Sequence, residues 1–332
     1  MMNRQSSRMS TLHMKRGTMR IIVMGTPDFA VPSLQAIAAM GNGFDIVLVV
    51  TGQDKPRKSK HAAAEASPIK QAALALNLPV HEVDDVNDPH FAEIVAAYKP
   101  DVIVVAAFRI LPPAVYSQAR LGAFNLHASL LPAYRGAAPV NWAIMNGEEE
   151  TGVTTFFLQQ RVDTGTIIMQ QKTAIAPEEN ATELIVRLAN IGADVVVETL
   201  RRIAAKNAAT APQDDSLASR APKLTRINTR INWEQPVATL HNFIRGLALK
   251  PSAWTTFNDK TLKIFRTTLS TPEHDHPSAP AGSLLVSHGK LYVHGSDGWL
   301  ELLALQLEGR KPMEAADFAR GLHVEGEALR LV

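Results

Sequence analysis

The sequence predicts an α/β protein, in which a mostly parallel, doubly wound sheet is followed by a small β-barrel or sandwich. Short β-branched runs alternate with helical patterns from about residue 19 onward, and beyond residue 223 short strands follow one another closely. Alternation of strands and helices is typical of parallel sheets, whereas closely spaced short strands are typical of small barrels and sandwiches. The 332 residues are enough for two domains that each bury a core.

The strands expected in the first part are continuous apolar runs, which are typical of strands covered on both faces. They cover residues 20–24, 45–50, 80–83, 101–107 and 124–127, followed by a strand pair at 151–158 and 166–174. The expected helices cover residues 31–40, 68–76, 90–98, 113–120, 139–146 and 182–206. Because such sheets bind ligands beyond the carboxyl ends of their strands, we expect a site there.

Residues 207–223, rich in Ala, Asp, Ser and Pro, are the expected linker between the domains. The first domain is therefore expected at 19–206 and the second at 224–332, where a helix at 237–247 precedes the short strands. Residues 1–18 contain basic residues but no acid, and we expect a disordered leader there. An organelle transit peptide has a similar composition, so import into an organelle stays open.

Composition excludes several classes of protein. The chain has no Cys, which excludes a disulfide scaffold, a thiolate nucleophile and a Cys-ligated metal. Its 34 basic and 32 acidic residues nearly balance, so net charge does not call for a polyanionic partner. No apolar run approaches the roughly 18 residues of a membrane span. We therefore expect a cytoplasmic bacterial protein with no membrane partner.

Asn125 and His127 are the first catalytic candidates. They lie two residues apart at the carboxyl end of an expected strand, so their side chains leave the same face of the sheet. An amide and an imidazole in one crevice supply a hydrogen-bond donor for a developing oxyanion and a titratable group beside it. The alternative is a histidine at a strand end that only bonds a neighbouring backbone group.

Asp163, in the turn between the paired strands, is the candidate carboxylate that would orient the imidazole. Aspartate close to glycine is also common in hairpin turns, which is the simpler interpretation. The pattern places no serine or threonine as a nucleophile, which favours direct transfer between two bound substrates. The junction Gly25–Ala30, where Thr26 is expected to cap a helix, matches neither a dinucleotide-binding nor a P-loop motif.

Two segments concentrate basic residues. Residues 54–60 carry a net charge of +3, and residues 206–266 contain ten basic and four acidic residues. Basic surfaces of this kind are typical of contacts with a phosphate backbone. A solvated loop is the alternative for the first segment.

Together these motifs resemble the methionyl-tRNA formyltransferase family. The resemblance rests on Gly25–Ala30 (GTPDFA), Asn125–His127 (NLH), Ser129–Pro132 (SLLP), Arg135–Pro139 (RGAAP) and Asp163–Gly165 (DTG). It implies a Rossmann-like catalytic domain followed by an OB-like domain. It also implies that 10-formyltetrahydrofolate is the co-substrate, that methionyl initiator tRNA is the acceptor, and that Asn125, His127 and Asp163 are catalytic.

The resemblance also implies binding residues. Those for the folate are Ser129, Leu130, Leu131, Pro132 and Ile110, and those for tRNA are Lys55, Arg57, Lys58 and Lys60. We expect a monomer that needs no metal, because hydrogen bonds activate the carbonyl. Phe108-Arg109 departs from the Tyr-Gly pair that is usual in the family, and the loop after Lys60 lacks the usual glycine.

Two other functions stay open from the sequence. A formyltransferase for amino-sugar nucleotides shares the NLH and SLLP signature and can carry a similar second domain, but its first strand–helix loop should differ from GTPDFA. A non-catalytic nucleic-acid-binding protein would have no reason to keep an intact set of Asn125, His127 and Asp163.

Overall fold

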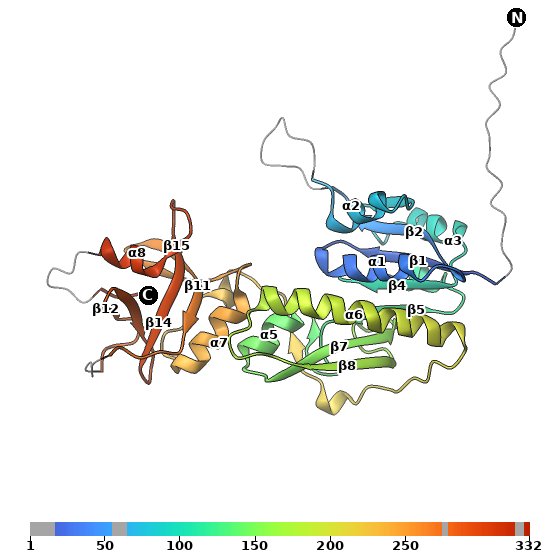
Figure 1. Cartoon of the computed structure of the whole chain (residues 1–332). Coiled ribbons are helices and arrows are strands. Elements are labelled where there is room, and N and C mark those ends of the chain that lie inside the picture. The colour runs from blue at the N-terminus through green and yellow to red at the C-terminus, as the bar shows by residue number, and fades with distance from the viewer. Residues whose placement is uncertain (1–16, 55–64, 274–277, 323–328) are drawn as a thin grey trace, which may run out of the picture.

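The computed structural model describes residues 17–54, 65–273, 278–322 and 329–332. They form an α/β domain and a C-terminal β domain joined by a connecting segment (Figure 1), which confirms the predicted fold class. The four basic residues expected to bind tRNA, Lys55, Arg57, Lys58 and Lys60, lie outside the described residues, as does most of the expected leader.

The first domain is built on a seven-stranded sheet with the order β3-β2-β1-β4-β5-β7-β8. Its strands are β1 (Met19–Gly25), β2 (Phe44–Gly52), β3 (Val80–Val83), β4 (Val102–Ala106), β5 (Ala123–His127), β7 (Glu150–Phe157) and β8 (Ile167–Ala174). The first five are parallel, and β7 runs antiparallel to both β5 and β8. Because strand order reverses at β1, the carboxyl ends of β1, β4 and β5 border a crevice.

Helices cover both faces of this sheet. The helices α1 (Val31–Ala39), α2 (Pro68–Ala75) and α6 (Ala181–Ala204) pack on one face, and α3 (Pro89–Ala97) and α4 (Pro113–Tyr116) pack on the other. Successive strand residues alternate between the two cores, so that Ile21 joins the first cluster and Ile22 the second. A capping box starts α6: Asn180 accepts from the backbone of Glu183, whose side chain accepts from the backbone of Asn180.

The first strand–helix junction differs from the expected cap. Pro27 is the residue before the short helix η1 (Asp28–Ala30), and Thr26 accepts a long hydrogen bond of 3.5 Å from Gly52 N instead of capping that helix. Gly25 is required here by close packing, since a Cβ at this position would lie 2.9 Å from the carbonyl oxygen of Ala106. The junction is therefore a packing point between β1, β4 and the helices.

The C-terminal domain is a small antiparallel barrel. Its main strands, in the order β10-β11-β14-β13-β12, are β10 (Ala253–Phe257), β11 (Lys260–Thr268), β14 (Trp299–Leu307), β13 (Lys290–His294) and β12 (Leu284–Ser287), and the short β15 (Met313–Glu314) also pairs with β14. Residues 329–332 close the gap between the two edge strands: Leu284 N donates to Leu329 O, and Thr256 and Val332 exchange backbone hydrogen bonds. The helices α7 (Val237–Leu247) and α8 (Ala315–Arg320) contribute to its core.

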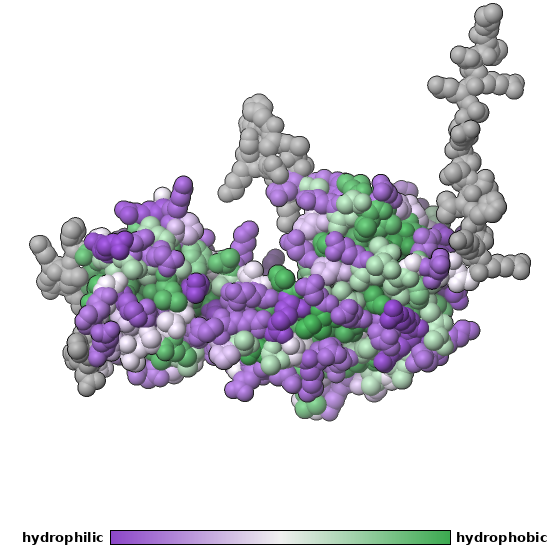
Figure 2. Space-filling view, viewed as in Figure 1, coloured by the Kyte–Doolittle hydropathy of each residue, from purple (hydrophilic) through white to green (hydrophobic). Residues whose placement is uncertain are grey.

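The two domains meet through helices. In the interface, α7 packs on α5 (Pro139–Met145), and the Asn141 amide donates to Gly246 O at 2.7 Å. Figure 2 shows hydrophilic side chains gathered near this junction, over the N-terminal end of α6. A cavity of about 800 Å³ opens there, with Arg187 on the first domain and His241 and Arg266 on the second among its lining residues. None of the helices in the described ranges is long and apolar enough to cross a membrane.

Residues 207–223, which we call the connector, pack against the first domain. They contain the short helix η2 (Asp215–Leu217) and the strand β9 (Arg220–Ala221), which pairs in parallel with β6 (Arg135–Gly136). In Figure 1 the connector leaves the end of α6 and returns beneath β8 toward the second domain. The expected linker is thus a structured part of the first domain's surface.

Candidate active site

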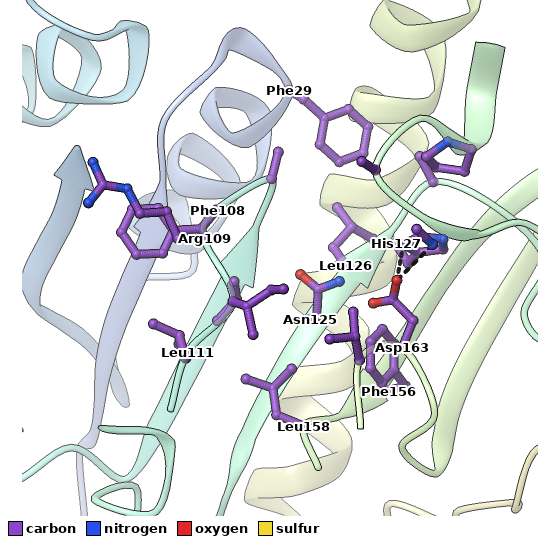
Figure 3. A pocket seen from close by; sticks show the side chains of 18 of the residues that line it. Phe29, Phe108, Arg109, Leu111, Asn125, Leu126, His127, Phe156, Leu158 and Asp163 are labelled. Carbon is purple, nitrogen blue, oxygen red and sulfur yellow. Dashed lines mark hydrogen bonds and ion pairs between the residues drawn. The ribbon is translucent and has the colours of Figure 1, made fainter. Parts of the chain in front are cut away.

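A pocket of about 610 Å³ lies at the carboxyl ends of the central strands (Figure 3). Most of its lining residues come from five segments: the η1 region around Phe29, the loop Phe108–Leu111 after β4, the end of β5, residues 136–141, and the turn 159–163 after β7. Most of the lining side chains are apolar. The pocket therefore offers a surface for a largely apolar ligand with a few polar groups.

Asn125, His127 and Asp163 meet in one part of this pocket. Asn125 and His127, two residues apart on β5, lie on the same face of the strand, as their spacing predicts, and both line the pocket. The Nδ1 atom of His127 and the Oδ2 atom of Asp163 are 4.0 Å apart, and both side chains are largely buried. Figure 3 shows the amide of Asn125 beside this pair. Among the residues that the structure describes, that amide has no hydrogen-bonding partner, so it is available to a ligand.

The protonation pattern of the neutral His127 ring follows from one contact. Its Nε2 atom lies 2.9 Å from the carbonyl oxygen of Tyr134. Because a carbonyl oxygen can only accept, Nε2 carries the hydrogen, and Nδ1 keeps a lone pair on the side of Asp163. His127 therefore makes the backbone contact of the simpler interpretation and still presents a basic nitrogen to the site.

Asp163 is held in an unusual backbone conformation. Its φ angle is +55°, in the left-handed region that aspartate tolerates better than most residues. Its Oδ2 atom accepts a hydrogen bond of 2.9 Å from Gly136 N. The carboxylate therefore has a fixed position between the imidazole and the loop that follows β5.

The loop 128–136 is held by side-chain hydrogen bonds at both ends. The hydroxyl of Ser129 donates to Ala133 O at 2.6 Å, and the hydroxyl of Tyr134 donates to Glu148 Oε1 at 2.5 Å. Burial and the carboxylate of Glu148 raise the pKa of Tyr134 to about 12, so the phenol keeps its proton near neutrality. A rigid loop keeps the carbonyl of Tyr134 and the amide of Gly136 aimed at His127 and Asp163.

The expected folate contacts are not brought together. Ile110 lines the pocket, where its side chain is 70% exposed. The segment Ser129–Pro132 is absent from the lining: Ser129 and Leu131 are buried, and Leu130 packs close to Gly152. None of these four residues lines the pocket, so their direct contact with the folate stays a prediction.

Sequence reasoning missed several groups of this site. The carbonyl of Tyr134 and the amide of Gly136 are backbone atoms, which carry no residue-type signal. Arg109, noted only as a departure, lines the pocket and donates a hydrogen bond to Asp84 O. Phe29 stands in the GTPDFA motif, and its ring forms part of the wall (Figure 3).

Comparison with known proteins identifies the family. Residues 19–200 match the formyl transferase family, and residues 223–323 match the formyl transferase C-terminal domain. The methionyl-tRNA formyltransferase of Chlorobium luteolum is 60% identical over 95% of this chain and 100% of its own length. The chain belongs to the methionyl-tRNA formyltransferase family. A family member from Syntrophus aciditrophicus is 43% identical over 91% of the chain and 95% of its own length.

Solved structures of lower identity share the fold of this family member. An N-formyltransferase from Helicobacter canadensis, solved with folinic acid and dTDP-3-aminofucose, has a TM-score of 0.64 at 21% identity and covers 86% of this chain and 98% of its own. HypX from Aquifex aeolicus, solved with tetrahydrofolic acid, has a TM-score of 0.60 at 18% identity, over 90% of this chain and 46% of its own. At such low identity these likenesses show the fold alone, and the high-identity relatives decide between the two formyltransferase branches.

Proposed function

We propose that this methionyl-tRNA formyltransferase family member transfers the formyl group of 10-formyltetrahydrofolate to the α-amine of methionyl initiator tRNA, as translation initiation requires. The proposal places the transfer in the pocket around Asn125, His127 and Asp163. The observation that carries it is the meeting of these side chains in a largely apolar pocket.

The chemistry starts from an amine that is partly neutral at cellular pH, because a free α-amine has a pKa of about 7.7. The formyl-folate supplies an activated carbonyl carbon, and the amine attacks this carbon. The amide of Asn125 donates a hydrogen bond to the oxygen on which negative charge develops. The carbon–nitrogen bond to the folate then breaks, and the departing nitrogen needs a proton.

His127 accepts the proton of the attacking amine and passes it to the departing nitrogen. Its free Nδ1 accepts a proton from the attacking amine, and the same N–H then donates to the departing nitrogen. Asp163 Oδ2, 4.0 Å from Nδ1, stabilises the positive ring while it holds the proton. The Nε2–H bond to Tyr134 O keeps the ring oriented through both steps.

The test offers the purified protein 10-formyltetrahydrofolate together with either methionyl initiator tRNA or a dTDP-amino sugar. We expect formylation of the tRNA only. Formylation of the sugar nucleotide would instead support the branch represented by the Helicobacter structure. Failure to bind folate at all would support the non-catalytic alternative.

The proposed tRNA-binding surface includes a basic cluster in which Arg226 and Arg230 stack on Trp254 of the barrel. The guanidinium carbons of Arg226 and Arg230 lie 4.1 and 5.5 Å from the ring centre of Trp254. The indole N–H of Trp254 in turn donates to Arg226 O at 2.9 Å. Arginines held on an aromatic ring are suited to phosphates and to stacked bases. Ile227, between them in sequence, is 89% exposed.

Replacing both Arg226 and Arg230 with Ala should weaken tRNA binding and flatten its salt dependence. Each lost phosphate contact lowers the slope of log K against log salt by about 0.7–0.9, so the double variant should lose about 1.5. Binding would be titrated between about 50 and 200 mM salt. The matched control replaces Arg201 and Arg202, near the far end of α6, and should leave the slope unchanged. An unchanged slope for the first variant would remove the cluster from the proposed tRNA-binding surface.

A further inference from the structure

The connector reaches the candidate active site through the side chain of Gln213. Its Nε2 donates to Asp163 O and to Gly165 O, both at 2.9 Å. Its Oε1 accepts from Nε and Nη2 of Arg135 at 3.0 and 2.7 Å. Both N–H groups and the carbonyl oxygen of this amide are therefore used, and the four bonds tie together three segments that are distant in sequence.

Backbone contacts next to Gln213 bring the connector against the loop after β5. Ser219 accepts with its carbonyl from Arg135 N at 2.9 Å and with its hydroxyl from Tyr134 N at 2.8 Å. A Cβ on Gly136, which has a φ angle of +130°, would lie 2.4 Å from Ala221 O. The approach is close enough to require glycine at the residue whose N–H binds Asp163.

These contacts fix the positions of both His127 and Asp163. The loop supplies Tyr134 O to the imidazole of His127, and Gln213 holds the peptide that follows the Asp163 side chain. A residue with a φ angle of +55° is held there by its surroundings and relaxes when they are lost. Without Gln213, the turn 161–165 would lose two of the hydrogen bonds that hold it in place beside the pocket.

We propose that Gln213 is a positioning residue for formyl transfer, which holds the turn so that the Asp163 carboxylate faces Nδ1 of His127. This inference rests on the proposed function, because Gln213 would affect formyl transfer only by positioning Asp163. Gln213 does not line the pocket, so it is not expected to contact either substrate. A displacement of about 1 Å in a catalytic group can cost about a hundredfold in rate.

The first test is Gln213→Glu, which keeps the shape and the oxygen that Arg135 binds but removes both donated hydrogen bonds. We expect kcat to fall by about ten- to a hundredfold, while KM for the folate and for tRNA changes little. Gln171→Glu, a matched change at an exposed glutamine on β8, should leave kcat unchanged. If Gln213→Glu loses the fold, as followed by thermal unfolding, the uncharged variant Gln213→Ala is measured instead.

The second test repeats the Gln213 change in an Asp163→Ala background. Since Gln213 acts through Asp163, we expect no further loss of kcat in the double variant. A full kcat for the folded Gln213 variant, or the same loss with and without Asp163, would overturn the inference while leaving the proposed function intact. Normal kcat for Asp163→Ala alone would instead remove Asp163 from the proposed mechanism, and the inference with it.

Discussion

His127→Ala should lower kcat for formylation of methionyl-tRNA by about 10²–10⁴, because the variant lacks the group that accepts and returns the proton. KM for both substrates should change much less, since the imidazole bonds Tyr134 O and faces Asp163. Single-turnover formylation with pre-bound folate measures the effect on the chemical step. His127→Asn, which keeps a polar side chain but no basic nitrogen, should show a similar loss.

The control for His127 is another buried histidine. His294 is 5% exposed in the barrel, where its ring packs edge-on to Trp299 at 4.7 Å. His294→Ala should lower the free energy of unfolding, as any buried ring truncation does, and leave kcat of the folded protein unchanged. Near-normal turnover in both folded His127 variants would show that this ring takes no part in proton transfer.

Asn125→Ala should lower kcat by about 10²–10³, the usual loss when one donor to a developing oxyanion is removed. Asn125→Asp should be at least as impaired, because a carboxylate would repel the developing negative charge. Stability should be nearly unchanged by Asn125→Ala, since the amide has no hydrogen-bonding partner among the described residues and leaves none unpaired. Rapid-quench formylation and urea unfolding measure the two quantities separately.

The matched control for Asn125 is Asn190→Ala, which removes an exposed amide on α6. It should leave kcat unchanged. If Asn125→Ala turned over normally, the oxyanion would have to be stabilised by another donor, and Asn125 would be a ligand contact at most.

Local sequence patterns predict the elements that depend on local physics. The buried parallel strands are visible as apolar runs, because both of their faces are covered. The shared face of Asn125 and His127 follows from the two-residue period of a strand, and both residues line the pocket. The predicted catalytic roles of these residues and of Asp163 still await the variants described above.

Contacts between distant segments could not be predicted in this way. The composition of 207–223 is that of a linker, yet Gln213 and Ser219 make their hydrogen bonds to loops about 50 and 80 residues earlier, and no local period encodes such pairings. Ser129–Pro132 resembles a ligand-binding motif, but these residues are absent from the pocket lining, and their contact with the folate stays a prediction. Thr26 is suited to a helix cap, yet its hydroxyl bonds to the end of β2.

The pairing of β6 with β9 limits how far the two halves can be treated as interchangeable modules. A fragment cut after α6 would contain Asn125, His127 and Asp163, but it would lack the strand and the glutamine amide that brace their loops. Replacing everything after α6 with the corresponding part of a distant homologue would also replace β9 and Gln213, which contact the loops of the first domain. We therefore expect a productive chimera to have its crossover placed after Ala221 rather than at the end of α6.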